Sequence, residues 1–138
     1  MSTIPSELLK AYTDTDYVVH ASPDFILNIS KHSNAFAQLT KTLRCWEAVF
    51  ITAHNPYSKP QSPLKNKESN DLLEDEIIQN GWTYFKGVGQ SKDCTWKEDS
   101  FLIFNIDQQS AYNLGKRHRQ NAVVWIGSNC TPILLICK

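Results

Sequence analysis

Hydrophobic residues along this chain repeat with two different periods, one typical of helices and one typical of strands. Phe36, Leu39 and Leu43 fall at i, i+3 and i+7, one face of an α-helix. Ser33 or Asn34 can cap the start of that helix. The segment 48–51 is instead apolar at every position, which is typical of a central strand covered on both faces.

Helical and strand patterns alternate along the rest of the chain. The resulting order, α-β-β-α-β-α-β-β-α-β-β, has closely spaced strand pairs that predict antiparallel hairpins. We therefore predict an α/β (α+β) fold, a single domain over residues 1–138 with a mixed, largely antiparallel sheet and about four packed helices. The expected helices are 6–12, 33–44, 62–79 and 107–118, and the expected strands are 17–20, 25–29, 47–53, 82–88, 100–106, 122–126 and 133–136.

Two finer expectations concern individual side chains. In the 62–79 helix, the apolar residues are expected to point toward the core, and these are Leu64, Leu72, Leu73 and Ile77. After the 82–88 strand, Gly87, Gly89 and Ser91 are expected to mark a loop.

Composition and charge narrow the class of protein. The chain has 138 residues, 41% of them hydrophobic and 20% charged, which is typical of a globular domain. Fourteen basic and fourteen acidic residues cancel, so net charge provides no general attraction to nucleic acid or to an anionic membrane. No apolar stretch approaches the roughly 20 residues of a membrane helix, and residues 1–7 do not resemble a signal peptide. We expect a cytoplasmic protein whose four cysteines are structural or incidental.

The most informative segment is the end of the 47–53 strand, where short polar side chains follow the apolar run. Thr52, Asn55 and Ser58 could bind a carbonyl, amide, hydroxyl or phosphate group of a ligand. The alternative is a turn in which Asn55 and Ser58 bond their own backbone. His54 adds a possible acid–base group, although a lone histidine beside a turn is more often structural.

Three further groups could join that segment. Asn66 and Asn70 are spaced i, i+4 on one helix face, or they cap and solvate the helix start. Glu98 shares a strand face with Ser100, where a raised pKa would suit a general base; the alternative is an exposed carboxylate at a strand edge. Gln120 precedes a late strand.

The basic cluster Lys116, Arg117, His118 and Arg119 could contact nucleic acid, but a helix C-terminus favours cations without any partner. Nucleic-acid binding is therefore disfavoured. The chain has no dinucleotide fingerprint, P-loop, zinc-protease helix, serine-hydrolase elbow or closely spaced metal ligands, so we expect no metal and no cofactor.

Together these segments resemble the bacterial domain-of-unknown-function family 3293, over about residues 11–126. The resemblance carries a set of marked positions and no reaction, and His54 stands where an aromatic residue is expected, which weakens a catalytic role for it. The matching pieces are Tyr12-x-x-Thr15-x-Tyr17, Phe50-Ile51-Thr52-Ala53-x-Asn55-Pro56-x-Ser58, Asn66-x-x-x-Asn70-x-x-Leu73 with Gly81, Trp96-x-Glu98-x-Ser100-Phe101, and Gln120-Asn121-Ala122.

Three hypotheses follow for the function. The first is one polar cleft for a small, possibly nucleotide- or amide-like molecule, with Glu98 as general base if the protein is an enzyme and the other polar residues as binding groups. The second is a non-enzymatic interaction or regulatory module, in which the polar residues satisfy one another and leave no open pocket. The third is a weak nucleic-acid-binding domain. The sequence does not determine the ligand or the oligomeric state. The binding residues of the first hypothesis are Thr52, Asn55, Ser58, Asn66, Asn70, Ser100 and Gln120.

Overall fold

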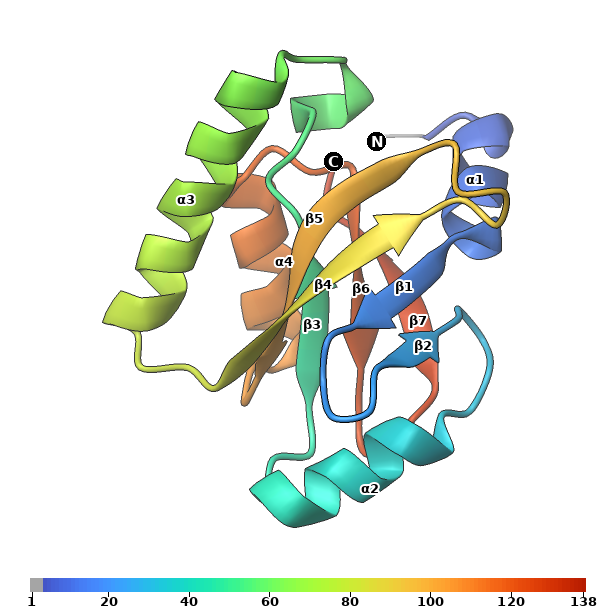
Figure 1. Ribbon diagram of the computed structural model, residues 1–138, viewed down its shortest axis with the longest axis vertical. Helices are drawn as coiled ribbons and strands as arrows, with labels where there is room; N and C mark the ends of the chain where they lie inside the picture. Colours follow the sequence, from blue (N-terminus) through green and yellow to red (C-terminus); the bar gives the residue numbers. More distant parts are fainter. Residues whose placement is uncertain (1–3) are drawn as a thin grey trace.

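One seven-stranded antiparallel sheet organises the chain (Figure 1). The computed structural model describes residues 4–138. Residues 1–3 belong to the segment 1–7, in which no signal peptide is expected, and they lie outside the described residues. Every strand pairing is antiparallel, and the strand order is β2-β1-β4-β5-β3-β6-β7. The strands are β1 (Asp16–Val19), β2 (Phe25–Leu27), β3 (Ala48–Ile51), β4 (Tyr84–Gln90), β5 (Lys97–Phe104), β6 (Ala122–Ile126) and β7 (Pro132–Ile136).

The helices follow the predicted order, and the caps expected at Ser33 and Asp107 are present. Ser33 Oγ accepts the Phe36 N–H at 3.0 Å, and Asp107 Oδ1 accepts the Ser110 N–H at 2.7 Å. The predicted element order and its three hairpins are thereby confirmed. The helices are α1 (Ser6–Asp14), α2 (Asn34–Leu43), α3 (Pro63–Gln79) and α4 (Gln108–Arg117), with a short 3₁₀ segment, η1 (Pro56–Ser58).

The two faces of the sheet carry separate cores because neighbouring residues of a strand point to opposite sides. On the outer face, Val49 and Ile51 of β3 pack in one core with Leu73 and Ile77 of α3, beside α4 (Figure 1). On the inner face, the core is built around α2; it contains Phe36, Phe50, Leu102, Phe104 and Val124. Strand β3 is buried at all four positions, which confirms that it is covered on both sides.

The sheet curls so that its two edge strands approach each other. The Ser30 N–H, just after β2, donates to the Pro132 carbonyl oxygen of β7 at 2.9 Å. Helix α2 lies across one end of the curl, and α1 lies at the other end (Figure 1). Helix α2 packs on the core at one end of the inner face, and α1 borders the other end.

Helix α3 corrects one prediction about the core. Leu73 and Ile77 are buried as expected, but Leu64 and Leu72 are 66% and 67% exposed. The N-terminal half of this helix turns polar residues inward instead, with Asn66 and Asn70 buried. The reason is its neighbour: this half contacts the polar backbone of the 52–55 loop and not an apolar surface.

Strand β4 corrects a second prediction. Gly87 and Gly89 lie within the strand and not in a loop after it. A Cβ at position 87 would lie 2.3 Å from the Val18 carbonyl oxygen and 3.0 Å from the Phe50 ring. Glycine at position 87 thus allows close backbone approach within the sheet, a use of glycine that looks like a loop signal in the sequence.

Candidate functional site

A cavity of about 1050 Å³ opens at the end of the inner face that α2 does not cover. This volume is at the upper end of the range typical of small-molecule sites. Its base is apolar and is formed by Tyr17, Phe50, Val124 and Leu134. Polar side chains from several elements also line the cavity; among the residues predicted for the site, these are Thr52, Asn55, Ser58, Glu98, Ser100 and Gln120.

Strand β5 shows how one face can serve two purposes. Its even-numbered residues all point to the inner face, as strand alternation requires. Leu102 and Phe104 pack in the core beside α2, whereas Glu98 and Ser100 line the cavity. The change from apolar to polar along this face thus follows the change from covered to open sheet.

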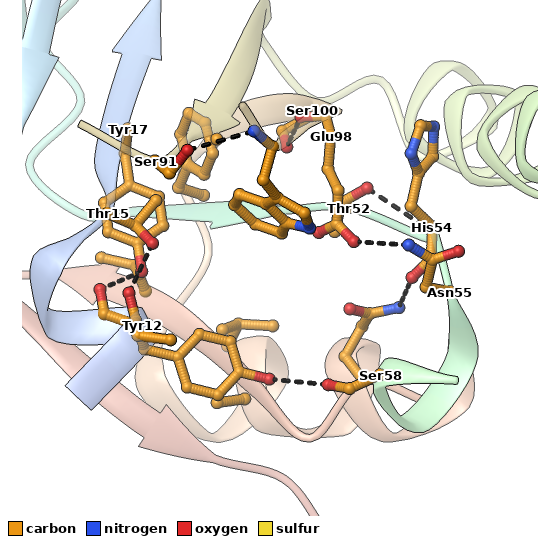
Figure 2. A pocket seen from close by; sticks show the side chains of 18 of the residues that line it. Tyr12, Thr15, Tyr17, Thr52, His54, Asn55, Ser58, Ser91, Glu98 and Ser100 are labelled. Atoms are coloured by element: carbon orange, nitrogen blue, oxygen red, sulfur yellow. Dashed lines mark hydrogen bonds between the residues drawn. The ribbon is translucent and has the colours of Figure 1, made fainter. Parts of the chain in front are cut away.

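Glu98 and Asn55 meet directly, although 43 residues separate them in the sequence. The Asn55 Nδ2 donates to Glu98 Oε2 at 3.0 Å (Figure 2). Burial raises the pKa of Glu98 to about 7, although the hydrogen bond from Asn55 acts in the opposite direction. This carboxyl group can therefore gain or lose a proton near neutral pH, as a general acid or base must.

The Asn55 side chain is fixed in orientation by its other contacts. Its Oδ1 accepts from Asn66 Nδ2 at 3.0 Å and from the Gln61 N–H at 3.1 Å, which leaves Nδ2 to face Glu98. In return, Asn66 Oδ1 accepts the Asn55 N–H at 2.9 Å. The backbone at Asn55, Tyr57 and Ser58 has positive φ angles of 45°, 54° and 62°. Such strain at non-glycine residues is held in place by surrounding contacts and clusters at functional sites.

Asn66 and Asn70 lie outside the cavity lining and hold the loop from behind. Asn70 Oδ1 accepts the Ala53 N–H at 2.8 Å, and its Nδ2 donates to the Asp99 carbonyl at 2.8 Å. Asn70 therefore joins the loop to β5 through two hydrogen bonds, the first buried and the second partly buried. These two residues position the loop, while Asn55 reaches the cavity.

Thr52 and Ser100 line the cavity, but their hydroxyl groups also bind backbone. Thr52 Oγ1 donates to the Asp99 carbonyl at 2.7 Å and accepts the His54 N–H at 3.1 Å. Ser100 Oγ donates to the Glu98 carbonyl at 2.9 Å. Both residues therefore fix the backbone on either side of the Glu98–Asn55 pair.

Tyr12 of α1 completes the cavity on the side opposite Glu98, and the candidate-site prediction missed it. Its hydroxyl lies 3.4 Å from Ser58 Oγ, which also accepts from Asn121 Nδ2 at 2.9 Å. Figure 2 shows Tyr12 and Ser58 across the open space from Glu98. Burial raises the pKa of Tyr12, so its phenol stays protonated at neutral pH. The Tyr12-x-x-Thr15-x-Tyr17 pattern was the signal in the sequence that could have identified it.

Gln120 and His54 meet at the cavity rim. Gln120 Nε2 donates to the His54 carbonyl at 3.1 Å and to the His118 carbonyl at 3.2 Å. Burial lowers the pKa of His54, and the negative charge of Asp99 raises it by less. The imidazole is therefore neutral at pH 7. That His54 has no catalytic role stays a prediction.

The basic cluster at the end of α4 is partly neutralised within the protein. Arg117 and His118 both contact the Glu76 carboxylate of α3, the second at 2.9 Å. Fewer cations are thus available to nucleic acid than the sequence indicated. Within residues 4–138, no group of three or more His, Cys, Asp or Glu side chains could hold a metal ion, and no helix is long and apolar enough to cross a membrane.

Fold and cavity together define an α+β protein with one curled antiparallel sheet and a ligand-sized cavity at its open end. The chain belongs to the family described as "Protein of unknown function (DUF3293)", whose model matches residues 51–123. All eight residues predicted for the site lie in that matched segment, from Thr52 to Gln120. Searches of curated proteins and of solved structures find no match.

Proposed function

We propose that this protein binds a small organic molecule in the cavity, and that the Glu98–Asn55 pair recognises a planar amide- or nucleobase-like group on it. The single observation that carries this proposal is the 3.0 Å contact between the two side chains in the cavity wall. A carboxyl group beside a carboxamide offers acceptors and donors side by side, which is the pattern that an amide or base edge complements.

The apolar side chains at the base of the cavity favour a ligand with a hydrophobic or aromatic body. Tyr17 and Phe50 meet edge to face, with ring centroids 5.3 Å apart, and both line the cavity. The one lysine of the lining, Lys92, is paired with Asp16 at 2.7 Å. Because a phosphate group would need a free cation, a base or nucleoside suits this cavity better than a nucleotide.

If the ligand undergoes a reaction, Glu98 is the group to which we assign proton transfer, since its pKa of about 7 suits a general base.

We also propose a cytoplasmic location and a bacterial source for this protein. The four cysteines are free, as expected in a reducing compartment.

A thermal-shift screen of nucleobases, nucleosides and aromatic amides tests the proposal. A ligand that binds only the folded state raises the melting temperature, and the shift grows with the ratio of ligand concentration to Kd. The expected result is a compound that stabilises the parent and the control Asn113→Ala, which alters an exposed amide of α4, but neither Asn55→Ala nor Glu98→Ala. Equal shifts in all four proteins would place binding elsewhere, and no shift across the panel would contradict the proposal.

A further inference from the structure

Two carboxylates of the cavity lining, Glu98 and Asp93, have no cation partner within residues 4–138, and of the two only Glu98 is partly buried. Asp14 and Lys92 of the lining are paired with an opposite charge, and the exposed Asp93 is bound by neutral donors. Asp14 of α1 is bound by Lys10 at 2.5 Å, Lys92 is bound by Asp16, and Asp93 accepts from Ser91 and Thr95.

Four aromatic residues line the same cavity as Glu98. The cavity is lined by Tyr12, Tyr17, Phe50 and Trp96, which come from α1, β1, β3 and the approach to β5. Ring faces attract a cation through their quadrupole, and the attraction grows where water is excluded. A partly buried carboxylate in a cavity lined by aromatic rings is thus the pattern expected around an organic cation.

We propose that the ligand group recognised by Glu98 is a planar organic cation, of the amidinium, guanidinium or protonated amino-heterocycle class, attached to an apolar body. This inference rests on the proposed function and adds that the planar group carries a positive charge. The free lone pairs of the Glu98 carboxylate accept the N–H groups of the cation, while Asn55 continues to donate to Oε2. The apolar body lies on the Tyr17–Phe50 base.

Proton balance gives this binding a characteristic dependence on pH. The groups that line the cavity and could titrate are Tyr12 and Asp14 of α1, Tyr17 of β1, His54 of the loop, Lys92 and Asp93 before β5, and Glu98 itself. Among them, Glu98 has its pKa near 7, raised by burial. Because the cation binds the ionised carboxylate, Glu98 releases a proton on binding below that pH, and affinity falls as the pH is lowered.

Benzamide and benzamidinium provide a test, since they share shape and differ in charge. Titration calorimetry at about pH 8, above the Glu98 pKa, is expected to show benzamidinium binding the parent protein about tenfold more tightly than benzamide. In Glu98→Gln, which keeps an acceptor for Asn55, the two probes are expected to bind equally. In the control Asp93→Asn, which removes an exposed carboxylate of the same lining, the preference is expected to remain.

The outcomes separate this inference from the proposed function. Benzamide binding as tightly as benzamidinium would overturn the cation and leave the proposed function standing. A preference for benzamidinium that persists in Glu98→Gln would also overturn it, because the charge would then be recognised elsewhere. If neither probe binds at millimolar concentration, the cation inference is wrong, and the nucleobase and nucleoside screen alone decides the proposed function.

Discussion

The two ends of the inner sheet face share the same strands but differ in what covers them. Under α2, Phe36 stacks on Phe104 with ring centroids 5.7 Å apart, and both side chains are fully buried. Under α1, the same strand β5 presents Glu98 and Ser100 to an open cavity. The comparison indicates that the α2 end provides stability by burying apolar area, whereas the α1 end keeps polar groups accessible at some cost in stability.

The largest expected effect lies at the covered end. Phe104→Ala should lower the free energy of unfolding by about 3–5 kcal/mol, since it leaves a cavity beneath α2. Urea denaturation measures this loss. The matched aromatic truncation at the open end, Trp96→Ala, should cost less than about 1 kcal/mol, because Trp96 is 41% exposed. Similar losses at the two ends would contradict the proposed division of roles.

The second prediction concerns the support of the open end. Asn70→Ala should cost about 2–3 kcal/mol, since it leaves the buried Ala53 N–H without an acceptor and breaks the bond to Asp99. The same denaturation experiment on Asn113→Ala, an exposed amide, should show a change within about 0.5 kcal/mol. If Asn70→Ala behaves like that control, Asn70 does not hold the loop.

The third prediction uses pH, and its sign follows from burial of Glu98. The pKa of Glu98 is about 7 in the folded protein and 4.5 ordinarily, so the stability associated with its protonation is present below 4.5 and is lost as the pH rises through 7. Glu98→Gln removes this loss. It should be more stable than the parent by about 1–3 kcal/mol at about pH 8, and equal to it near pH 4.

Glu76 is the control for that sign. Burial raises the pKa of Glu76, but the hydrogen bonds from Arg117 and His118 lower it by a larger amount. The net effect is a lowered pKa. Its stabilising effect is present above its ordinary pKa and lost as the pH falls. Glu76→Gln should therefore destabilise the protein at neutral pH, and by less in acid. Unfolding curves across the pH range that show the same sign for both variants would contradict the assignment of Glu98.

The smallest effect is expected at the contact between α1 and η1. Tyr12→Phe removes only a long, 3.4 Å hydrogen bond to Ser58, so the loss of stability should be under about 1 kcal/mol. Tyr112→Phe, which removes an exposed 3.4 Å bond with Lys116, is the matched control and should cost nothing measurable. A loss above about 2 kcal/mol for Tyr12→Phe, beyond a typical single hydrogen bond, would show that α1 is part of the core.

The sequence predicted the elements better than it predicted their surroundings. Hydrophobic periodicity and helix capping depend on residues that are close in the sequence. The helices that they predicted, with the caps Ser33 and Asp107, are present in the structure. The inward face of α3 did not follow from periodicity, because its partner there is the polar backbone of a loop distant in sequence. Leu64 and Leu72 were therefore assigned wrongly to the core.

The candidate site shows the same limit. No spacing rule joins Asn55 to Glu98, since the β3–β5 pairing brings them together. The resemblance grouped them with Asn66 and Asn70 but could not separate residues that line the cavity from those that position the loop. Tyr12 was overlooked as a site residue because an aromatic side chain on a short helix is more often part of a core.

The contact between Ser30 and Pro132 has a further consequence for behaviour at high concentration. Exposed sheet edges are templates on which a strand of another molecule can add, and this is a common route to aggregation. Here one edge strand, β2, has only three residues, and the other, β7, begins at a proline whose carbonyl already accepts from Ser30. The curl that opens the cavity thus also leaves little edge for unwanted strand addition.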